Sequence, residues 1–120
     1  MKIALASSGQ KLTSLVDQRF GRCPYFLIVD SKNKHFKVLK NTAIKADRGV
    51  GISAAQIIVD QKVKVIIAGN FGPNAIRVLR TSDLKLFSAS PKTTINQALD
   101  QLEHHQLKPV ILNDDFINRS

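Results

Sequence analysis

The sequence predicts one α/β domain with three layers, a mixed β-sheet between two layers of helices. Short apolar runs rich in Val and Ile are bounded by turn residues, which is typical of buried strands. In the second half of the chain these runs alternate with segments of helical periodicity, which is typical of parallel strand–helix–strand units. The chain has 120 residues, 43% of them hydrophobic, and this length suits one domain.

Three strands are expected in the first half of the chain. Residues 2–6 form a short apolar run followed by serines and a glycine, which is the pattern of a buried central strand. Residues 25–29 are also apolar, and turn-forming residues 31–34 connect them to the alternating segment 35–40. This arrangement predicts a β-hairpin whose second, lysine-containing arm is an edge strand.

The second half predicts three helices and two further strands. The helices are expected at residues 53–60, 73–80 and 93–105, and the strands at 63–68 and 84–87. Ser53 and Gln56 have the spacing of a capping box at the start of the first helix. Pro109 follows the last helix, so we expect a domain over residues 1–108 and a C-terminal tail over residues 109–120.

These elements predict a five-stranded sheet of order 3-2-1-4-5, with the second strand antiparallel, as in ribonuclease-H-like folds. The two crossover connections should be right-handed. Tracing the chain through this sheet places all three helix N-termini at one end, together with the loop after the first strand. Chain direction changes there between the first and fourth strands, and ligands of open α/β sheets tend to bind at such a point.

The charge favours an anionic partner. Eighteen Lys and Arg residues against nine Asp and Glu give a net charge of +9, and residues 1–48 carry +7 of it. Exposed lysines also keep proteins soluble, and charge alone does not distinguish nucleic acid from a small inorganic anion.

The longest apolar stretch, Val65–Ala68, is far too short to span a membrane, and no secretory signal follows Met1. We therefore expect a soluble, cytoplasmic protein.

The predicted anion site combines helix N-termini, cations and glycines at that end of the sheet. Unpaired N–H groups at helix N-termini favour anions, and glycine lets a ligand approach the backbone. Gly49 to Ala54 match a dinucleotide-binding pattern, but a polar segment precedes them where that pattern requires a strand. We interpret them as a glycine-flanked helix start that can accept an anion, with a purely structural turn as an equal alternative. The candidate binding residues are Arg19, Arg22, Arg48, Gly49, Gly51, Gly69, Asn70 and Gly72.

Cys23, the single cysteine, is the candidate metal ligand. A thiolate suits iron, molybdenum or copper(I), and neighbouring Arg19 and Arg22 favour the deprotonated form. The alternative is that Cys23 is a small hydrophobic residue beneath its loop. A conventional iron–sulfur cluster takes four protein ligands, so a cluster bound here must be preassembled, shared between subunits or held mainly by charge and N–H groups.

Four blocks of the sequence resemble the dinitrogenase iron-molybdenum cofactor biosynthesis family, which includes NifX-type carriers. They are MKIA at residues 1–4, RFGRCPYFLIVD at 19–30, GVGISAAQ at 49–56 and IAGNFGPNA at 67–75. The resemblance covers about residues 1–105 and implies a ribonuclease-H-like fold and non-catalytic binding or carriage of an iron–sulfur or molybdenum-containing cluster. Cluster donor and acceptor proteins would be its partners, and the chain would be a monomer or homodimer.

One position departs from the family pattern. Members associated with nitrogenase often carry a histidine, a suspected cofactor ligand, where this chain has Arg19. This departure argues against the nitrogenase cofactor itself as the cargo.

The alternative function is binding of nucleic acid or of nucleotide phosphates, suggested by the fold type and the charge. Ribonuclease-H chemistry requires several carboxylates around two metal ions. Asp17 and Asp47 are the carboxylates that our tracing places at the relevant end. We therefore expect no enzymatic activity and rank nucleic acid below a metal–sulfur cluster.

Overall fold

The computed structural model describes residues 1–46 and 49–110 and contains a six-stranded mixed sheet. Its order is β3-β2-β1-β4-β5-β6. The strands are β1 (Lys2–Ser7), β2 (Tyr25–Asp30), β3 (Phe36–Lys40), β4 (Val65–Ala68), β5 (Lys85–Ser88) and β6 (Lys108–Pro109). Central β1 pairs antiparallel with β2 and parallel with β4, so the direction changes beside it.

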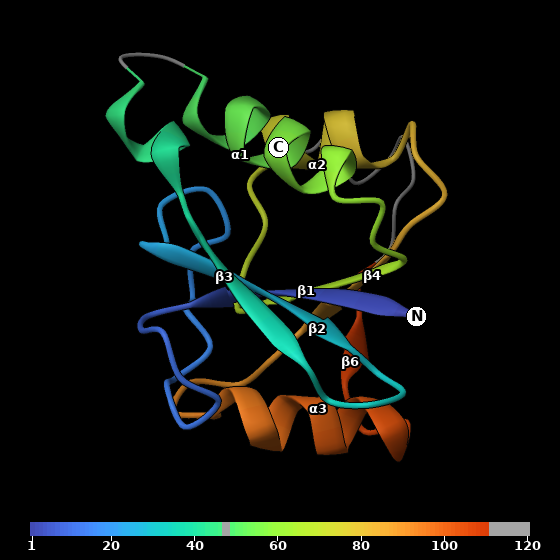
Figure 1. Ribbon diagram of the computed structural model, residues 1–120. Helices are drawn as coiled ribbons and strands as arrows, with labels where there is room; N and C mark the ends of the chain where they lie inside the picture. Colours follow the sequence, from blue (N-terminus) through green and yellow to red (C-terminus); the bar gives the residue numbers. More distant parts are fainter. Residues whose placement is uncertain (47–48, 111–120) are drawn as a thin grey trace.

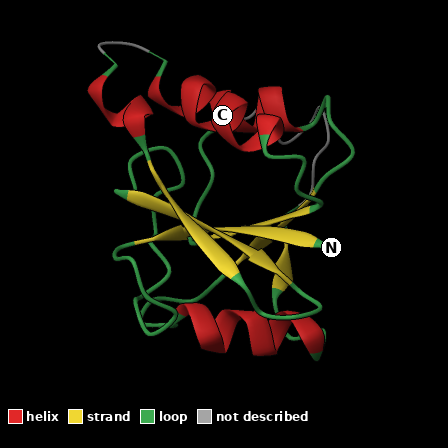
Figure 2. Ribbon diagram, in the orientation of Figure 1, coloured by secondary structure: helices red, strands yellow, loops and turns green. Residues whose placement is uncertain are grey.

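Helices cover both faces of the sheet (Figures 1 and 2). Helices α1 (Val50–Asp60) and α2 (Pro73–Leu79) lie on one face, and α3 (Ile95–Glu103) lies on the other. A short 3₁₀ helix, η1 (Thr42–Lys45), precedes α1. None of the described helices is long and apolar enough to cross a membrane.

The alternation of side chains along β1 explains why the core has two parts. Ala4 and Ala6 point into the cluster beneath α1 and α2, whereas Ile3 and Leu5 point into the cluster beneath α3. All four side chains are at most 2% exposed, because a strand covered on both faces buries both sets of side chains. The continuous apolar run in the sequence follows from this double burial.

The three-layer architecture, the order of the first five strands and the antiparallel second strand are confirmed. The sheet differs by one additional strand, because β6 pairs antiparallel with β5. A two-residue strand has no detectable alternation, and its proline is tolerated because β6 lies at the edge of the sheet. The domain boundary at residue 108 stays a prediction.

The capping box expected at Ser53 and Gln56 is wrong. Helix α1 begins earlier, at Val50, after Gly49 in the left-handed region with φ of 66°. A true capping box forms instead at α3, where Thr94 and Gln97 exchange hydrogen bonds between side chain and backbone. The glycine, and not the serine, therefore marks the start of α1.

Candidate functional site

Three segments that are distant in the sequence enclose a cleft of about 350 Å³. They are the loop after β1, the start of α1 and the start of α2. The lining residues are Gly21, Arg22, Gly49, Val50, Gly51, Gly72, Pro73, Asn74 and Ala75. We call this the glycine cleft.

Close glycine contacts build the floor of the glycine cleft. A Cβ atom added to Gly21 would lie 3.2 Å from the Cα of Gly51, and one added to Gly51 would lie 3.5 Å from the backbone nitrogen of Ala75. The absence of side chains at these positions lets the loop, α1 and α2 approach one another at backbone level. A ligand in this cleft therefore meets backbone groups directly.

The start of α1 supplies hydrogen-bond donors to the glycine cleft. Its N-cap residue, Gly49, has no side chain to cap the helix, and among the described residues no group accepts a hydrogen bond from the N–H of Val50 or Gly51. The positive end of the helix dipole adds to the field of Arg22, whose side chain is exposed on the same cleft. The local electrostatics favour an anion with several acceptor atoms.

The start of α3 lies beside the loop after β1, at the end of the sheet where the sequence placed it, but it does not line the glycine cleft. The N–H groups of Ile95 and Asn96 donate to the carbonyls of Ser14 and Leu12, at 2.9 Å each. Helix α3 also lies on the opposite face of the sheet from α1 and α2 (Figure 1). Its first turn therefore stabilises the loop after β1 and offers no free donors to the cleft.

Asn41 holds the arginine–cysteine loop in place against the glycine cleft. Its side chain is 3% exposed, and its amide nitrogen donates to the carbonyls of Gly21 and Cys23 at 3.0 and 2.8 Å. Its side-chain oxygen accepts a hydrogen bond from the N–H of Ala43 in η1. The position of Gly21 over Gly51 therefore depends on a side chain from the segment after β3.

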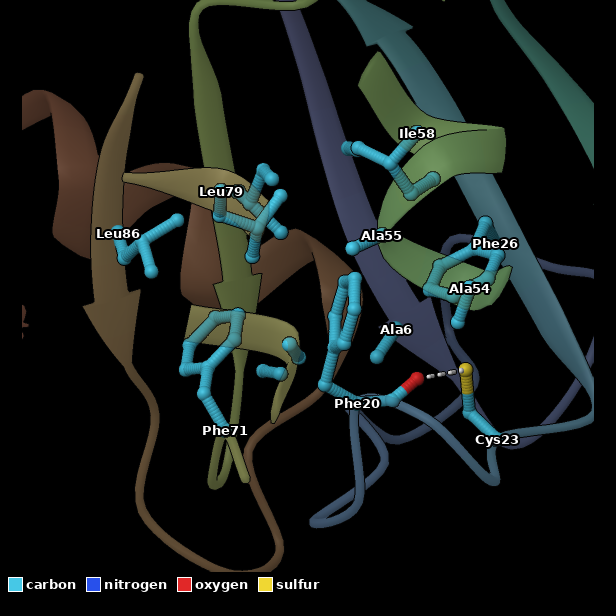
Figure 3. Packing of buried hydrophobic residues seen from close by; sticks show 14 of the residues in the cluster. Ala6, Phe20, Cys23, Phe26, Ala54, Ala55, Ile58, Phe71, Leu79 and Leu86 are labelled. Atoms are coloured by element: carbon cyan, nitrogen blue, oxygen red, sulfur yellow. Dashed lines mark hydrogen bonds between the residues drawn. The ribbon is translucent and has the colours of Figure 1, made fainter. Parts of the chain in front are cut away.

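Cys23 lies beneath this loop as part of the core. Its side chain is fully buried, and Sγ donates to the carbonyl of Phe20 at 3.2 Å (Figure 3). Burial, followed by the negative charge of Asp17, raises the pKa of the thiol from 9.0 to about 12. The conformation described here therefore favours a protonated, packed cysteine over an exposed thiolate.

The predicted binding residues fall into two neighbouring groups. Arg22, Gly49, Gly51 and Gly72 line the glycine cleft. Gly69 and Asn70 line a second cleft, of about 330 Å³, with Phe71, Ser88, Lys108, Pro109 and Val110. The structure therefore does not bring all the predicted glycines into one pocket.

Arg19, another of the predicted binding residues, lines neither cleft. Arg19 is exposed, and its Nε lies 3.6 Å from Oδ1 of Asp17, whose carboxylate also accepts the backbone N–H of Arg19. Arg48 lies outside the described residues.

Sequence reasoning missed several residues of the site. Gly21, Asn74 and Ala75 line the cleft, and Asn41 supports it, although none was among the predicted binding residues. A signal existed for Gly21, a glycine directly before the predicted Arg22. No local pattern distinguishes Asn41 from an ordinary turn residue, because its partners are 18 and 20 residues away.

The fold and the cleft together define a small α/β domain with an amide-lined, cationic site at a change of strand direction. The model of the family described as dinitrogenase iron-molybdenum cofactor matches residues 1–105, and the chain belongs to this family. Among the described residues, no group of three or more His, Cys, Asp and Glu side chains is placed to hold a metal ion.

The chain is also similar to a protein of known sequence and to solved structures. An uncharacterized protein of Methanocaldococcus jannaschii is 33% identical over 102 residues, which is 82% of each chain. The apo form of the orange protein from Desulfovibrio gigas superimposes with a TM-score of 0.85 at 29% identity, covering 92% of this chain and 96% of that one. A Thermotoga protein provisionally named NifB and assigned to the DUF35 family gives 0.79 at 30% identity, covering 94% and 97%. The family points to a role in the biosynthesis or carriage of the iron-molybdenum cofactor.

Proposed function

We propose that this protein binds and carries a compact anionic metal–sulfur cluster, iron–sulfur or molybdenum-containing, in the glycine cleft and catalyses no reaction on it. The observation that supports the proposal most is that Arg22 lines the same cleft as the start of α1, where no described residue accepts the N–H of Val50 or Gly51. The chain's membership of the iron-molybdenum cofactor family supplies the chemical class of the cargo.

The chemistry of the cleft suits such a cargo. Sulfide and oxo atoms at the surface of a cluster accept hydrogen bonds, and the backbone N–H groups of Val50 and Gly51 are donors without a described partner. The guanidinium of Arg22 compensates part of the negative charge. In this proposal the exposed Arg19 adds to the long-range field, Arg48 adds a further charge, and Gly69 and Asn70 contact a cluster that extends into the second cleft.

The proposal assigns retention of the cluster to charge and N–H groups first. Coordination by Cys23 requires the thiol to leave the carbonyl of Phe20 and to lose a proton whose pKa is about 12. A metal ion supplies a driving force for both steps, since thiolates bind metals in deprotonated form. Substitution Cys23→Ser separates the two modes: metal retention falls if the sulfur is a ligand and is unchanged if charge and N–H groups hold the cluster.

Anaerobic reconstitution with iron, sulfide and molybdate tests the proposal. After desalting, metal analysis of the intact protein should find retained metal. Arg22→Gln should lower retention about tenfold or more, because a charge-assisted hydrogen bond is lost. Lys37→Gln on β3 removes the same charge away from the cleft and serves as the control. Protein that stays colourless and metal-free, or equal retention in the two variants, contradicts the proposal.

Nucleic acid is the competing anionic ligand. The net charge of +9 attracts any polyanion, and such binding weakens steeply with added salt. Filter binding across a salt series distinguishes the two ligands. Tight, salt-resistant and sequence-selective binding of nucleic acid would reverse our ranking.

The same proposal places the protein in the cytoplasm, as a monomer or homodimer. It receives its cluster from a donor protein and delivers it to an acceptor, and it has no membrane partner. Crosslinking of the loaded protein in extracts tests these partnerships.

A further inference from the structure

A cavity larger than the glycine cleft lies at the opposite end of the sheet. Its volume is about 540 Å³, and Met1 is among its lining residues, at the end of the sheet where Figure 1 marks the start of the chain. The other lining residues are Lys64, Val65, Asp83, Lys85, Phe87, Leu102, His105, Leu107 and Pro109. Cavities of this size are in the range of small-molecule sites. We call it the basal cavity.

The floor of the basal cavity is apolar and belongs to the core beneath α3. Val65 and Leu107 are buried in that core, and Phe87 and Leu102 are partly buried against it. These side chains come from β4, β5, α3 and the segment before β6. The floor is therefore fixed by four packed segments, which suits a rigid apolar body.

Two lysines lie on the rim of the basal cavity, beside its apolar floor. Lys85 alternates with Leu86 along β5 and so shares the face of Phe87, which packs toward α3. Lys64 is adjacent, because its carbonyl accepts the N–H of Lys85 at 3.0 Å. Both side chains are exposed, and neither forms an ion pair with any described residue. Their charges are available to a ligand whose body covers the floor.

Asp83 on the same rim limits the charge of that ligand. A second negative charge close to the lysines would be repelled by this carboxylate, so a singly charged group suits the rim better than a phosphate dianion. We propose that the basal cavity binds an amphipathic monoanion, a molecule with an apolar body and one carboxylate. The apolar body lies on Val65, Phe87 and Leu102, and the carboxylate lies between Lys64 and Lys85. This site is separate from the glycine cleft and does not depend on the function proposed there.

Fluorescence titration of the full chain tests the site with 8-anilinonaphthalene-1-sulfonate, an apolar aromatic monoanion. The neutral analogue N-phenyl-1-naphthylamine is the matched probe. Both should bind saturably, and Leu102→Gln should weaken both. Lys85→Gln should weaken the sulfonate about two- to fivefold, the range of one exposed charge pair, and leave the neutral probe unchanged. Lys37→Gln and Arg22→Gln, which remove charges elsewhere, should change neither.

Three outcomes overturn the proposal. If Arg22→Gln weakens the sulfonate as much as Lys85→Gln does, the probe binds in the glycine cleft. If the natural chain binds neither probe but the double substitution Ile111→Ser and Leu112→Ser does, the chain's own C-terminal segment occupies the cavity. If neither probe binds and Leu102→Gln converts a dimer to a monomer in sedimentation, the cavity is an interface between copies. Urea unfolding of each variant verifies that it is folded before it is scored.

Discussion

The side-chain amide of Asn41 donates a hydrogen bond to the carbonyl of Gly21 across 3.0 Å, although the two residues are 20 positions apart. The same nitrogen donates to the carbonyl of Cys23, so one buried side chain fixes both ends of the Gly21–Cys23 segment. This segment carries Arg22 and closes over Gly51. The geometry of the glycine cleft therefore depends on a residue that does not line it.

Replacing Asn41 with alanine should destabilise the protein by about 2–3 kcal/mol, because its four side-chain hydrogen bonds are lost and the carbonyls of Gly21 and Cys23 lose their side-chain donor. Urea unfolding measures the change. Asn96→Ala, at an exposed position of α3, should stay within about 0.5 kcal/mol of the natural protein. Equal stability of the two variants would show that Asn41 does not hold the loop.

Two glycines of the cleft should respond differently to the same substitution. A Cβ at Gly21 would lie 3.2 Å from the Cα of Gly51, a backbone atom that cannot rotate away, whereas a Cβ at Gly72 meets nothing within 4 Å. Gly21→Ala should therefore cost about 1–3 kcal/mol through overpacking, and Gly72→Ala about 0.5 kcal/mol or less. Thermal unfolding of both variants measures this. A greater loss at Gly72 would contradict the close contact.

The sequence was sufficient for most of the fold because burial leaves local patterns. The apolar run of β1 is set by burial on both faces of the sheet, and this pattern is visible without coordinates. The start of α1 was misplaced because Ser53 and Gln56 imitate a capping box inside the first turns of the helix. Strand β6 was not predicted, because its pairing with Phe87 and Ser88 is a tertiary contact without a local sequence pattern.

The candidate site was harder to predict, because its geometry depends on contacts between segments that are distant in the sequence. Chain tracing placed Arg22 and the starts of α1 and α2 at one end of the sheet, and the structure puts them on one cleft. It could not show that Gly69 and Asn70 line a different cleft, because that cleft is completed by residues 108–110, which are distant in the sequence. Nor could it show that Ser14 and Leu12 already accept the donors of α3.

The backbone at Gly49 and Lys62 should make these positions respond in opposite directions. Both have positive φ, 66° at Gly49 and 57° at Lys62, where side chains are disfavoured. Gly49→Ala should lower the free energy of unfolding by about 1 kcal/mol, and Lys62→Gly should raise it by up to about 1 kcal/mol. Asparagine tolerates the left-handed conformation better than alanine does, so Gly49→Asn should lower the free energy of unfolding by less than Gly49→Ala. Chemical denaturation of the three variants checks the order, and stabilisation by Gly49→Ala would be inconsistent with it.

The buried thiol of Cys23 should make stability fall at high pH. Its pKa is raised in the native state to about 12 from 9.0, so the native thiol keeps its proton where the unfolded thiol has lost it. Below pH 9 the protonated thiol contributes its full share to the free energy of unfolding. This contribution is lost as the pH rises from 9 toward 12, by at most about 1.4 kcal/mol per pH unit. Comparison with Cys23→Ala isolates this effect, because lysine and tyrosine titrate in both proteins. The stability difference between the natural chain and Cys23→Ala should shrink across that interval. A constant difference would mean that the thiol is as accessible to ionisation in the native state as in the unfolded chain, and Cys23 would then be available as a thiolate ligand without any opening of its loop.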